Sequence, residues 1–448
     1  MSDRVVKYLK EKGFVYPGSA IYGGLANSWD YGPLGAMLKD NIKAAWKNEF
    51  ITQQANVVQF DSSIILNNKV WETSGHIDKF NDPLIDCKSC KSRFRADHLL
   101  EEKGISFKGD DLTDITEKIK SNIECPSCSA NDWTDTKQFD LMFRVNSSKT
   151  DSAEFNFLRP ETAQGIFINY KNLLNTYNFT LPYGVAQIGK AFRNEVTPGN
   201  FIFRTKEFEQ MELELFCSPS AAEGIFEEYL LKINSFLKRI HLNDEALKSF
   251  DVAKDSLAHY STRTVDYEYN FSFGWGELLG LANRTDFDLT NHSVASGEKV
   301  LYNDLKEGTK YVPHVIEASF GVERLLLAII ESSLKMFKTE TEDREVLSLP
   351  FELSPYKVCV APLTNKLVDE AEELFSNLTK QDIGAISFET SGSIGKRYRR
   401  QDQIGTYFVI TYDFDTLEDD SVTIRHRDTM KQDRIKISDI KTYINEQK

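Results

Sequence analysis

The stretch that decides the fold is GKAFRNEVTPGNFIFRTKEFE, residues 189–209. Apolar and β-branched residues around it predict two strands, at 185–192 and 206–216. The Pro-Gly-Asn segment between them predicts a loop. Arg193 and Glu195 stand where the first strand ends. This pattern indicates a pair of antiparallel strands with charged side chains gathered at one end.

The second strand has two chemically different faces, because successive side chains of a strand point to opposite sides. One face holds an aromatic ring, an amide and two carboxylates, and we expect it to meet solvent: Phe208, Gln210, Glu212 and Glu214. The other face is apolar and predicts the core: Met211, Leu213 and Leu215. Phe208 and Glu212 are about 13 Å apart along the strand, which suits the two ends of one extended ligand. A solvent-facing acidic strand with no ligand is the simpler interpretation.

A third informative run is VPHVIEASFGVER, residues 312–324, which leads into the apolar segment 325–330. The pattern predicts a strand that turns into a helix at Gly321. Such a turn directs free backbone N–H groups toward an anion, and Arg324 lies in the same first helical turn. Phosphate is the natural ligand of this arrangement.

The rest of the first 350 residues predicts long helices and a further strand, without regular alternation of the two. Apolar residues recur at helical spacing from Leu34, directly after Pro33, to Phe50, and again over 222–240. Residues 266–273 predict a strand. A doubly wound parallel sheet requires strand–helix alternation, so we expect an α+β fold with an antiparallel sheet flanked by helices.

The pattern changes after Ser354-Pro355. Short strands and helices then do alternate, which predicts a separate small α/β domain with a boundary near 350–356. The expected elements are strands at 356–361 and 406–412, a helix at 367–380 and an extended segment at 385–389.

Composition limits the class of protein. The chain has 448 residues, enough for two or three domains, and 41% of them are hydrophobic and 27% charged, as in ordinary globular proteins. The longest aliphatic run falls far short of the roughly 20 residues that span a bilayer, and the N-terminus lacks the apolar segment of a secretory signal. We therefore expect a cytoplasmic protein with no membrane partner. A net charge of −14 repels nucleic acid, so any RNA must meet a local basic patch.

One such patch is the run Lys396, Arg397, Tyr398, Arg399 and Arg400. Basic side chains bind RNA phosphates, and an aromatic ring can stack on an unpaired base. The run therefore predicts tRNA-binding residues, with a solvated helix face as the alternative.

Four of the six cysteines form two Cys-x-x-Cys pairs: Cys87, Cys90, Cys125 and Cys128. Four thiolates from two such turns can close a tetrahedral zinc site. A closed set of four ligands leaves no open position for chemistry, so we expect structural zinc that stabilises an insertion. Free thiols are the alternative.

These motifs resemble those of the class II aminoacyl-tRNA synthetases. The resemblance rests on Gly32-Pro-Leu-Gly35 with its helix, Phe192-Arg-Asn-Glu195 with its loop, and Gly321-Val-Glu-Arg324. The runs 159–165, 275–286, 317–321 and 391–398 resemble the glycyl branch of the family, which is homodimeric. The resemblance implies a catalytic domain at 1–86 and 139–350, a zinc-knuckle insertion at 87–138, and an anticodon-binding domain at 355–448. The first catalytic segment includes the dimer-interface motif.

The resemblance also implies an ATP site with Mg²⁺. Its residues are expected to be Arg193, Asn194, Glu195, Phe203, Arg204, Phe208, Glu277, Leu278, Gly321 and Arg324. Arg193, Glu277 and Arg324 are the expected catalytic residues. Arg193 would hold the α-phosphate, Arg204 and Arg324 the outer phosphates, and Glu277 the magnesium. Glu195 would bind the adenine amino group, and Phe208 would stack on the ring.

For glycine the resemblance implies an acidic pit. The expected residues are Arg95, Glu161, Phe208, Glu212, Glu317, Ser319 and Gly321. The implied reaction is the ATP-dependent attachment of glycine to the 3′ end of tRNA(Gly) through glycyl-adenylate, with release of AMP and pyrophosphate. Every competing amino acid is larger than glycine, so a rigid pit can exclude them by overlap, and we expect no editing domain.

Two alternatives remain open at this stage. One is a class II enzyme for another small amino acid, and the other is a non-catalytic tRNA-binding relative that acts as a scaffold. The joint presence of Arg193, Glu195, Phe208, Glu277 and Arg324 argues against the scaffold. His76, in Ser74-Gly-His76, receives no chemical role from the sequence.

Overall fold

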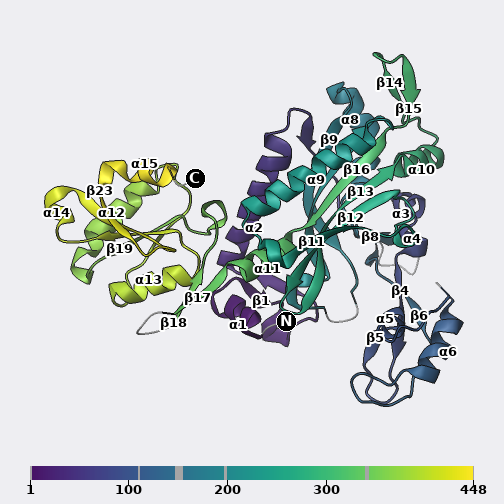
Figure 1. Cartoon of the computed structure of the whole chain (residues 1–448), viewed down its shortest axis with the longest axis horizontal. Helices are drawn as coiled ribbons and strands as arrows, with labels where there is room; N and C mark the ends of the chain where they lie inside the picture. Colours follow the sequence, from purple (N-terminus) through teal and green to yellow (C-terminus); the bar gives the residue numbers. More distant parts are fainter. Residues whose placement is uncertain (1–2, 109–110, 147–154, 196–198, 339–342, 447–448) are drawn as a thin grey trace.

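The computed structural model describes residues 3–108, 111–146, 155–195, 199–338 and 343–446. Figure 1 shows a large central body, a smaller C-terminal part beside it and an insertion that projects from the body. None of the helices within these ranges is both long and apolar enough to cross a membrane.

The central body is built on a seven-stranded sheet in the order β11-β12-β13-β16-β10-β9-β3. Its strands are β3 (Val57–Gln59), β9 (Tyr183–Phe192), β10 (Glu207–Cys217), β11 (Leu247–Asp251), β12 (Arg263–Phe271), β13 (Gly274–Thr285) and β16 (His314–Gly321). All neighbours are antiparallel except β3 and β9. The antiparallel core predicted from the sequence is confirmed, and the predicted strands at 185–192, 206–216 and 266–273 correspond to β9, β10 and β12.

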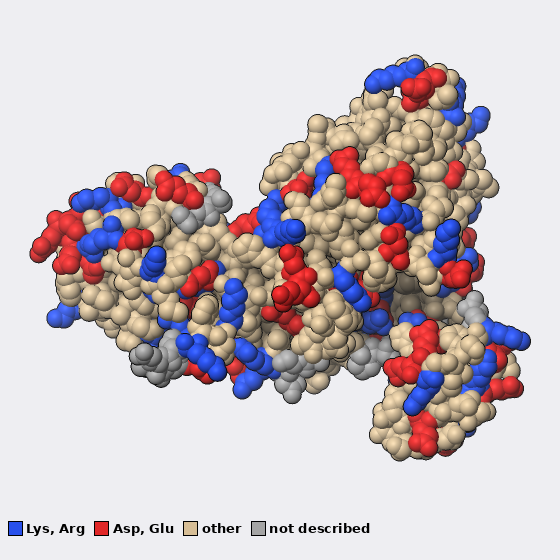
Figure 2. All heavy atoms as spheres, viewed as in Figure 1, with Lys and Arg blue, Asp and Glu red and all other residues tan. Residues whose placement is uncertain are grey.

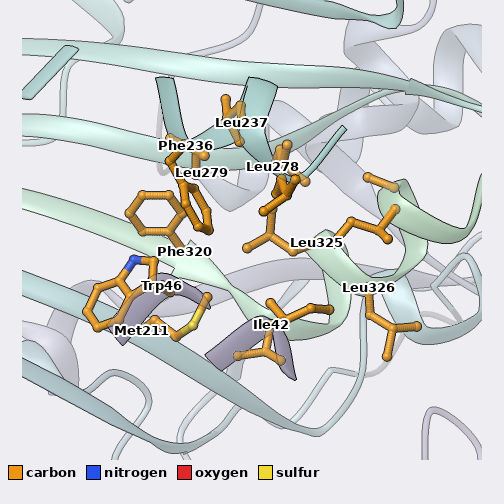
Figure 3. Packing of buried hydrophobic residues seen from close by; sticks show 14 of the residues in the cluster. Ile42, Trp46, Met211, Phe236, Leu237, Leu278, Leu279, Phe320, Leu325 and Leu326 are labelled. Atoms are coloured by element: carbon orange, nitrogen blue, oxygen red, sulfur yellow. The ribbon is translucent and has the colours of Figure 1, made fainter. Parts of the chain in front are cut away.

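Three helices cover one face of this sheet: α2 (Pro33–Lys47), α9 (Ala222–Arg239) and α11 (Val322–Ser333). The odd-numbered residues of β10 point toward them, and Met211 is fully buried there, as the alternation predicts. Figure 3 shows Trp46 of α2 beside Phe320 of β16, with ring centroids 6.0 Å apart, and Leu325 of α11 in the same cluster. Helix α2 passes so close to the preceding chain that a Cβ on Gly35 would lie 1.9 Å from the carbonyl oxygen of Phe14.

The opposite face of the sheet is only partly covered. Helices α7 (Ala163–Phe167), α8 (Tyr170–Tyr177) and α10 (Phe287–Ser296) pack over one end of it, against residues such as Val185 and Phe216. The expectation that Glu214 meets solvent is therefore wrong, because these helices bury it completely, at 0% exposure. The other end of this face stays open and forms the site described below.

The insertion carries its own small sheet in the order β5-β4-β6. Its elements are β4 (Asn81–Asp86), β5 (Arg93–Arg95), α5 (Ala96–Glu101), α6 (Leu112–Asn122) and β6 (Lys137–Asp140). Both stems of the insertion are joined by backbone hydrogen bonds at its base. Leu141 N donates to Phe80 O at 3.2 Å, and Asn194 N donates to Leu141 O at 2.7 Å. The returning stem is thus tied directly to the segment after β9.

The C-terminal part is a separate five-stranded α/β unit in the order β20-β19-β21-β22-β23. Its strands are β19 (Val358–Pro362), β20 (Ile386–Phe388), β21 (Phe408–Tyr412), β22 (Ser421–His426) and β23 (Gln432–Lys436). Its main helices are α12 (Val368–Leu378), α13 (Ile394–Gln403) and α15 (Ile440–Asn445). β19 pairs in parallel with β20 and β21, as the alternation after Pro355 predicts. The order of elements follows the sequence prediction closely.

Helix α1 (Asp3–Glu11) and the hairpin of β17 (Leu334–Lys338) and β18 (Asp343–Leu347) lie between the body and the C-terminal unit. Lys12 Nζ donates to Gln403 Oε1 at 2.9 Å. Asp402, fully buried in α13, pairs with Arg344 of β18 and with Arg425 of β22. These polar contacts hold the two units in a defined relation.

Candidate active site

A cavity of about 360 Å³ lies on the open part of the sheet, over β10, β13 and β16. Every ATP- or glycine-binding residue predicted from the sequence lines it, except Arg95 and Asn194: Glu161, Arg193, Glu195, Phe203, Arg204, Phe208, Glu212, Glu277, Leu278, Glu317, Ser319, Gly321 and Arg324. The strand register explains this convergence. Glu212 lies opposite Ser319, and Gln210 lies opposite Gly321.

One end of the cavity is cationic. Arg193 follows β9 and is fixed by a hydrogen bond from its Nε to Pro160 O at 3.1 Å. Its guanidinium lies 5.3 Å from the ring of Phe208. Arg324, in the first turn of α11, lies 4.5 Å from the ring of Phe203. Arg204 lines the same end. Arg193 and Arg324 are thus held beside aromatic rings, and the positive charge of the three arginines faces a space that suits a flat base and phosphate groups.

Glu277 lies at this end on β13, and its carboxylate contacts Arg324. Nη1 of Arg324 donates to Glu277 Oε2 at 3.0 Å and to the backbone oxygen of Glu277 at 2.9 Å. The Arg324 guanidinium holds the pKa of Glu277 below its ordinary value. The side chain is 55% exposed, so the carboxylate is ionised and reachable by a metal ion at neutral pH.

The other end of the cavity is acidic, with Glu212 at its floor. Oε2 of Glu212 accepts from Thr162 N at 3.1 Å and from Thr162 Oγ1. Oε1 accepts from Gln210 Nε2 at 3.0 Å and from Ser319 Oγ at 3.1 Å. Four donors therefore fix the orientation of one carboxylate, and the loop before α7 is bound to the centre of the sheet.

Glu161 and Glu317 stand beside Glu212, and each is held by side chains that are not among the predicted site residues. Glu161 contacts His76, with Nε2 and Oε2 3.3 Å apart, and accepts from Gln164 Nε2 at 3.1 Å. Glu317 accepts from Arg284 Nη1 at 2.9 Å. Two of these supporting residues had a local signal. Gln164 lies three residues after Glu161, and Arg284 lies four residues before its second partner, Asp288.

Five carboxyl groups gather at this end: Glu161, Glu212, Glu214, Asp288 and Glu317. Burial raises the pKa of Glu212, and the charges of Glu317 and Glu161 raise it further. Burial likewise raises the pKa of Glu317, although Arg284 opposes this. Burial would also raise the pKa of Glu161, but His76 and Arg284 hold it below its ordinary value. A compact cationic group placed among these carboxylates would relieve their repulsion.

Comparison with known proteins identifies the family that carries this site. Residues 143–333 match the model of the tRNA synthetase class II core domain (G, H, P, S and T), and residues 357–447 match the anticodon binding domain. The chain is 50% identical to the glycine–tRNA ligase of Alkaliphilus oremlandii over 99% of this chain and 98% of the relative. It is 52% identical to that of Malacoplasma penetrans, over 98% and 96% of the two chains. It is 48% identical to that of Geobacillus thermodenitrificans, over 99% of this chain and 97% of the relative.

The chain belongs to the glycine–tRNA ligases. This membership removes the two alternatives that the sequence left open, a class II enzyme for another small amino acid and a non-catalytic scaffold. It also agrees with the fold, because the class II core match covers β9, β10, β13 and β16, the strands that build the cavity.

The insertion of this glycine–tRNA ligase gathers its four paired cysteines at one point. Their sulfur atoms all lie within 4.8 Å of one another, with Cys87 and Cys128 3.7 Å apart and Cys90 and Cys125 3.6 Å apart. A zinc ion bound to four thiolates at about 2.3 Å separates the sulfurs by about 3.8 Å. The thiols therefore fit one tetrahedral metal ion.

Two predicted residues lie outside the cavity of this ligase. Arg95, on the insertion, pairs with Asp82 at 3.0 Å and with Asp97 at 2.5 Å instead of reaching the acidic end. Asn194 does not line the cavity, but its backbone N–H donates to Leu141 O and so joins the segment after β9 to the stem of the insertion. The assignment of Arg95 to glycine therefore stays a prediction, and in this structure its guanidinium is paired within the insertion.

The basic run of the anticodon-binding domain forms half of helix α13, and its five residues differ in exposure and contacts. Lys396 and Arg399 are exposed. Arg397 is 1% exposed and donates to Pro362 O, Thr390 O and Asn365 Oδ1. Its placement contradicts a role in phosphate binding, because the guanidinium is used inside the domain. The hydroxyl of Tyr398 bonds Thr411, and Arg400 pairs with Glu389. On the face shown in Figure 2, basic and acidic side chains are interspersed over this domain.

Proposed function

We propose that this glycine–tRNA ligase forms glycyl-adenylate from glycine and ATP in the cavity and then transfers glycine to the 3′ end of tRNA(Gly). The observation that carries the proposal is the polarity of one continuous cavity. Three guanidinium groups line one end, and three carboxylates line the other: Arg193, Arg204 and Arg324, and Glu161, Glu212 and Glu317. A triphosphate matches the first end, and the ammonium group of glycine matches the second.

At the cationic end we assign Arg193 to the α-phosphate and Arg204 and Arg324 to the outer phosphates. Phe208 is assigned to the adenine ring and Glu195 to its amino group. The aromatic contact of Arg193 with Phe208 supports this, because it sets the guanidinium beside the plane on which a base would stack. Magnesium, when bound by Glu277, supplies further neutralisation of phosphate charge, and the lowered pKa of that carboxyl supports the assignment.

The first step needs no general base. The carboxylate of glycine is already ionised at pH 7 and attacks the α-phosphorus, and pyrophosphate leaves. What this chain supplies is alignment of the two reactants and neutralisation of the phosphate charge. The contacts that fix Arg193 and Arg324 before any ligand arrives support such pre-organised catalysis. In the second step a ribose hydroxyl of the tRNA 3′ adenosine attacks the adenylate and AMP leaves. We assign no base to it.

Selection of glycine follows from the size and rigidity of the acidic end. Glu212 is held by four donors, and Ser319 lies directly against it, so a side chain larger than hydrogen would overlap atoms that cannot move easily. Exclusion by overlap can be strong, whereas a roomy pocket discriminates against one missing methylene by only about 1 to 3 kcal/mol. An editing domain is then unnecessary.

Zinc in the insertion and tRNA at the C-terminal domain complete the proposal. Zinc bound by the four cysteines would have a structural role, since these ligands fill its coordination shell. We assign the exposed residues Lys396 and Arg399 of α13 to contact with tRNA phosphates. The match of residues 357–447 to the anticodon binding domain supports tRNA contact by the domain that carries α13.

We also propose that the enzyme is a homodimer that works in the cytoplasm. An exposed apolar segment shortly before α2 supports a dimer contact: Ile21 is 88% exposed, Tyr22 86% and Leu25 57%. Exposed apolar side chains that lie close together are typical of protein–protein interfaces. Analytical ultracentrifugation of the wild type and of an Ile21→Asp, Tyr22→Asp variant would test this contact.

The decisive test of the function is ATP–pyrophosphate exchange with each small amino acid in turn. We expect exchange that depends on glycine and is at least about a hundredfold weaker with alanine or serine. Exchange of equal rate with alanine would contradict the specificity, and a complete lack of exchange would contradict adenylate formation. Arg193→Gln should abolish exchange, and Lys248→Gln, a surface change on β11, serves as its control.

A further inference from the structure

His76 occupies a fixed position behind the acidic end of the cavity. It is the first residue of α4 (His76–Lys79) and follows α3 (Asn68–Thr73) by a short turn. The imidazole lies between two aromatic rings, with centroids 5.5 Å from Trp71 and 5.5 Å from Phe80. Both contacts are edge-to-face, with interplanar angles of 79° and 62°. The plane of the ring is therefore set by packing.

The two ring nitrogens of His76 have different partners. Nδ1 is 2.8 Å from Ser74 Oγ, and Nε2 is 3.3 Å from Glu161 Oε2. Because a carboxylate only accepts, Nε2 must carry a proton to bond it. Ser74, whose Oγ also lies 3.3 Å from Trp71 O, fixes the other side of the ring. A histidine held at one nitrogen so that the other can direct a ligand is a recurrent device in active sites.

Glu161 has a second fixed contact. Its Oε1 accepts from Gln164 Nε2 at 3.1 Å, and Gln164 is itself held by Asp288 and His292. His76 and Gln164 therefore grip the two oxygens of one carboxylate from different sides. These two contacts fix the orientation of the Glu161 carboxylate, which lines the cavity.

The same turn of helix also reaches the cationic end. Phe80 follows His76 by four residues, and the Arg193 guanidinium lies 5.1 Å from the Phe80 ring. Arg193 donates to Pro160 O, and Pro160 directly precedes Glu161. Two adjacent side chains of one segment thus contact the residues assigned to the glycine ammonium and to the α-phosphate.

We propose that His76 is a positioning residue, which orients the Glu161 carboxylate toward the ammonium of glycine while Phe80 supports Arg193 at the α-phosphate. The inference rests on the proposed function, because it takes Glu161 as a ligand of glycine. It gives the segment 76–80 a specific task, namely to fix the distance between the two groups that hold the reactants. A histidine that merely fills the core would have no such effect on glycine.

Two matched substitutions separate the proposal from a packing role. The amide nitrogen of Gln can occupy the place of Nε2, whereas that of Asn reaches only the place of Nδ1. We therefore expect His76→Asn to raise the KM for glycine about tenfold, the loss of one hydrogen bond to a charged group, with the KM for ATP changed less than about twofold. His76→Gln should restore the glycine KM to within about threefold of the wild type.

The measurement is ATP–pyrophosphate exchange with the full-length enzyme, with thermal unfolding recorded for each variant. Ser74→Ala, which frees Nδ1, is a milder second variant and should raise the glycine KM by about threefold. Phe80→Leu should instead raise the KM for ATP or lower kcat. If His76→Asn and His76→Gln show equal losses, or if neither changes the glycine KM, the proposal is wrong.

A double-mutant cycle distinguishes failure of this inference from failure of the proposed function. Glu161→Gln alone should raise the glycine KM, and adding His76→Asn to it should cost less than it does in the wild type, because the two residues act on one interaction. A wild-type glycine KM in Glu161→Gln would remove Glu161 from the glycine site. If Glu161→Gln raises the glycine KM and the effects of Glu161→Gln and His76→Asn are fully additive, the role of His76 is wrong and the proposed function stands.

Discussion

Arg284 and Glu317 form an ion pair inside the acidic end of the cavity, with Nη1 of Arg284 2.9 Å from Oε2 of Glu317. The same guanidinium donates twice to Asp288, at 2.8 and 2.9 Å, and lies 3.8 Å from the ring of Tyr260. Arg284 therefore fixes a carboxylate of the proposed glycine site while it offsets part of the charge of the acidic cluster.

Loss of this guanidinium should be expensive, because it would leave two buried carboxylates without their cation. We expect Arg284→Met to lower the free energy of unfolding by about 3 to 5 kcal/mol, measured by urea denaturation at pH 7. Arg263→Met is the matched control, since Arg263 pairs with three carboxylates at the surface, whereas Arg284 pairs with two in the interior. It should cost under about 1 kcal/mol, and equal losses in the two variants would contradict the importance of burial.

Glu214 should be protonated in the folded enzyme. It lies opposite Glu317 on the neighbouring strand, and no donor among the described residues reaches its oxygens. Burial, and after it the charge of Glu317, raise the pKa of Glu214 well above its ordinary value. A protonated Glu214 can donate to Glu317, and an ionised one would add a fifth buried charge.

The substitution Glu214→Gln tests this through pH. The folded state binds a proton that the unfolded state releases above pH about 4.5, so wild-type stability falls as pH rises toward the folded pKa. Glu214→Gln removes this contribution. We expect the variant to lose under about 1 kcal/mol at pH 5 and to gain relative to the wild type toward pH 8. A relative loss that grows with pH would show that Glu214 is ionised.

Glu212→Gln should weaken glycine binding and leave the fold intact. The amide keeps the shape of the side chain but removes the negative charge beside the ammonium group and introduces a donor that faces Thr162, Gln210 and Ser319. We expect the glycine KM to rise at least about tenfold. Glu207→Gln, at the exposed start of the same strand, is the control. An unchanged KM in Glu212→Gln would exclude Glu212 from the glycine site.

The cysteine cluster should hold about one zinc ion per chain in protein purified without added metal, as measured by elemental analysis. Cys125→Ser removes a buried ligand and should abolish zinc and expose the insertion to proteolysis. Cys217→Ser, a buried cysteine of β10 outside the cluster, should keep the metal. A metal content near zero in the wild type would refute the site.

Binding of tRNA should weaken as salt increases, with log affinity falling linearly with log salt concentration. Lys396→Ala should reduce that slope by about one unit. Arg397→Ala should instead destabilise the C-terminal domain by about 2 kcal/mol, because carbonyl groups bonded by the guanidinium would lose their donor. If Lys396→Ala leaves the slope of log affinity against log salt concentration unchanged, the assignment of α13 to the tRNA-binding surface is wrong.

The strands of the core could be predicted because each shows the alternation that a two-sided sheet requires, as in Met211 and Leu213. What covers a face cannot be read from the strand itself. Glu214 looked exposed because nothing local indicates that α7, α8 and α10 pack over it. The burial of Arg397 likewise had no local signal, because its partners Pro362, Asn365 and Thr390 come from other segments.

Most residues that line the cavity could be predicted from the family motifs. The residues that hold the cavity carboxylates in place could not. Glu161 and His76 are far apart in the sequence, so only the folded chain reveals their contact. Arg95 was assigned to glycine by resemblance, whereas the insertion binds it to Asp82 and Asp97. Long-range contacts of this kind depend on how separate segments pack, which local periodicity does not encode.

The backbone hydrogen bonds at the base of the insertion limit how the insertion can be redesigned. These hydrogen bonds, from Leu141 N to Phe80 O and from Asn194 N to Leu141 O, connect a peripheral module to the residue that directly follows Arg193. Because these bonds set the position of the chain next to Arg193, we expect that shortening either stem by one residue would displace Arg193 and lower turnover, even with every cavity-lining side chain unaltered.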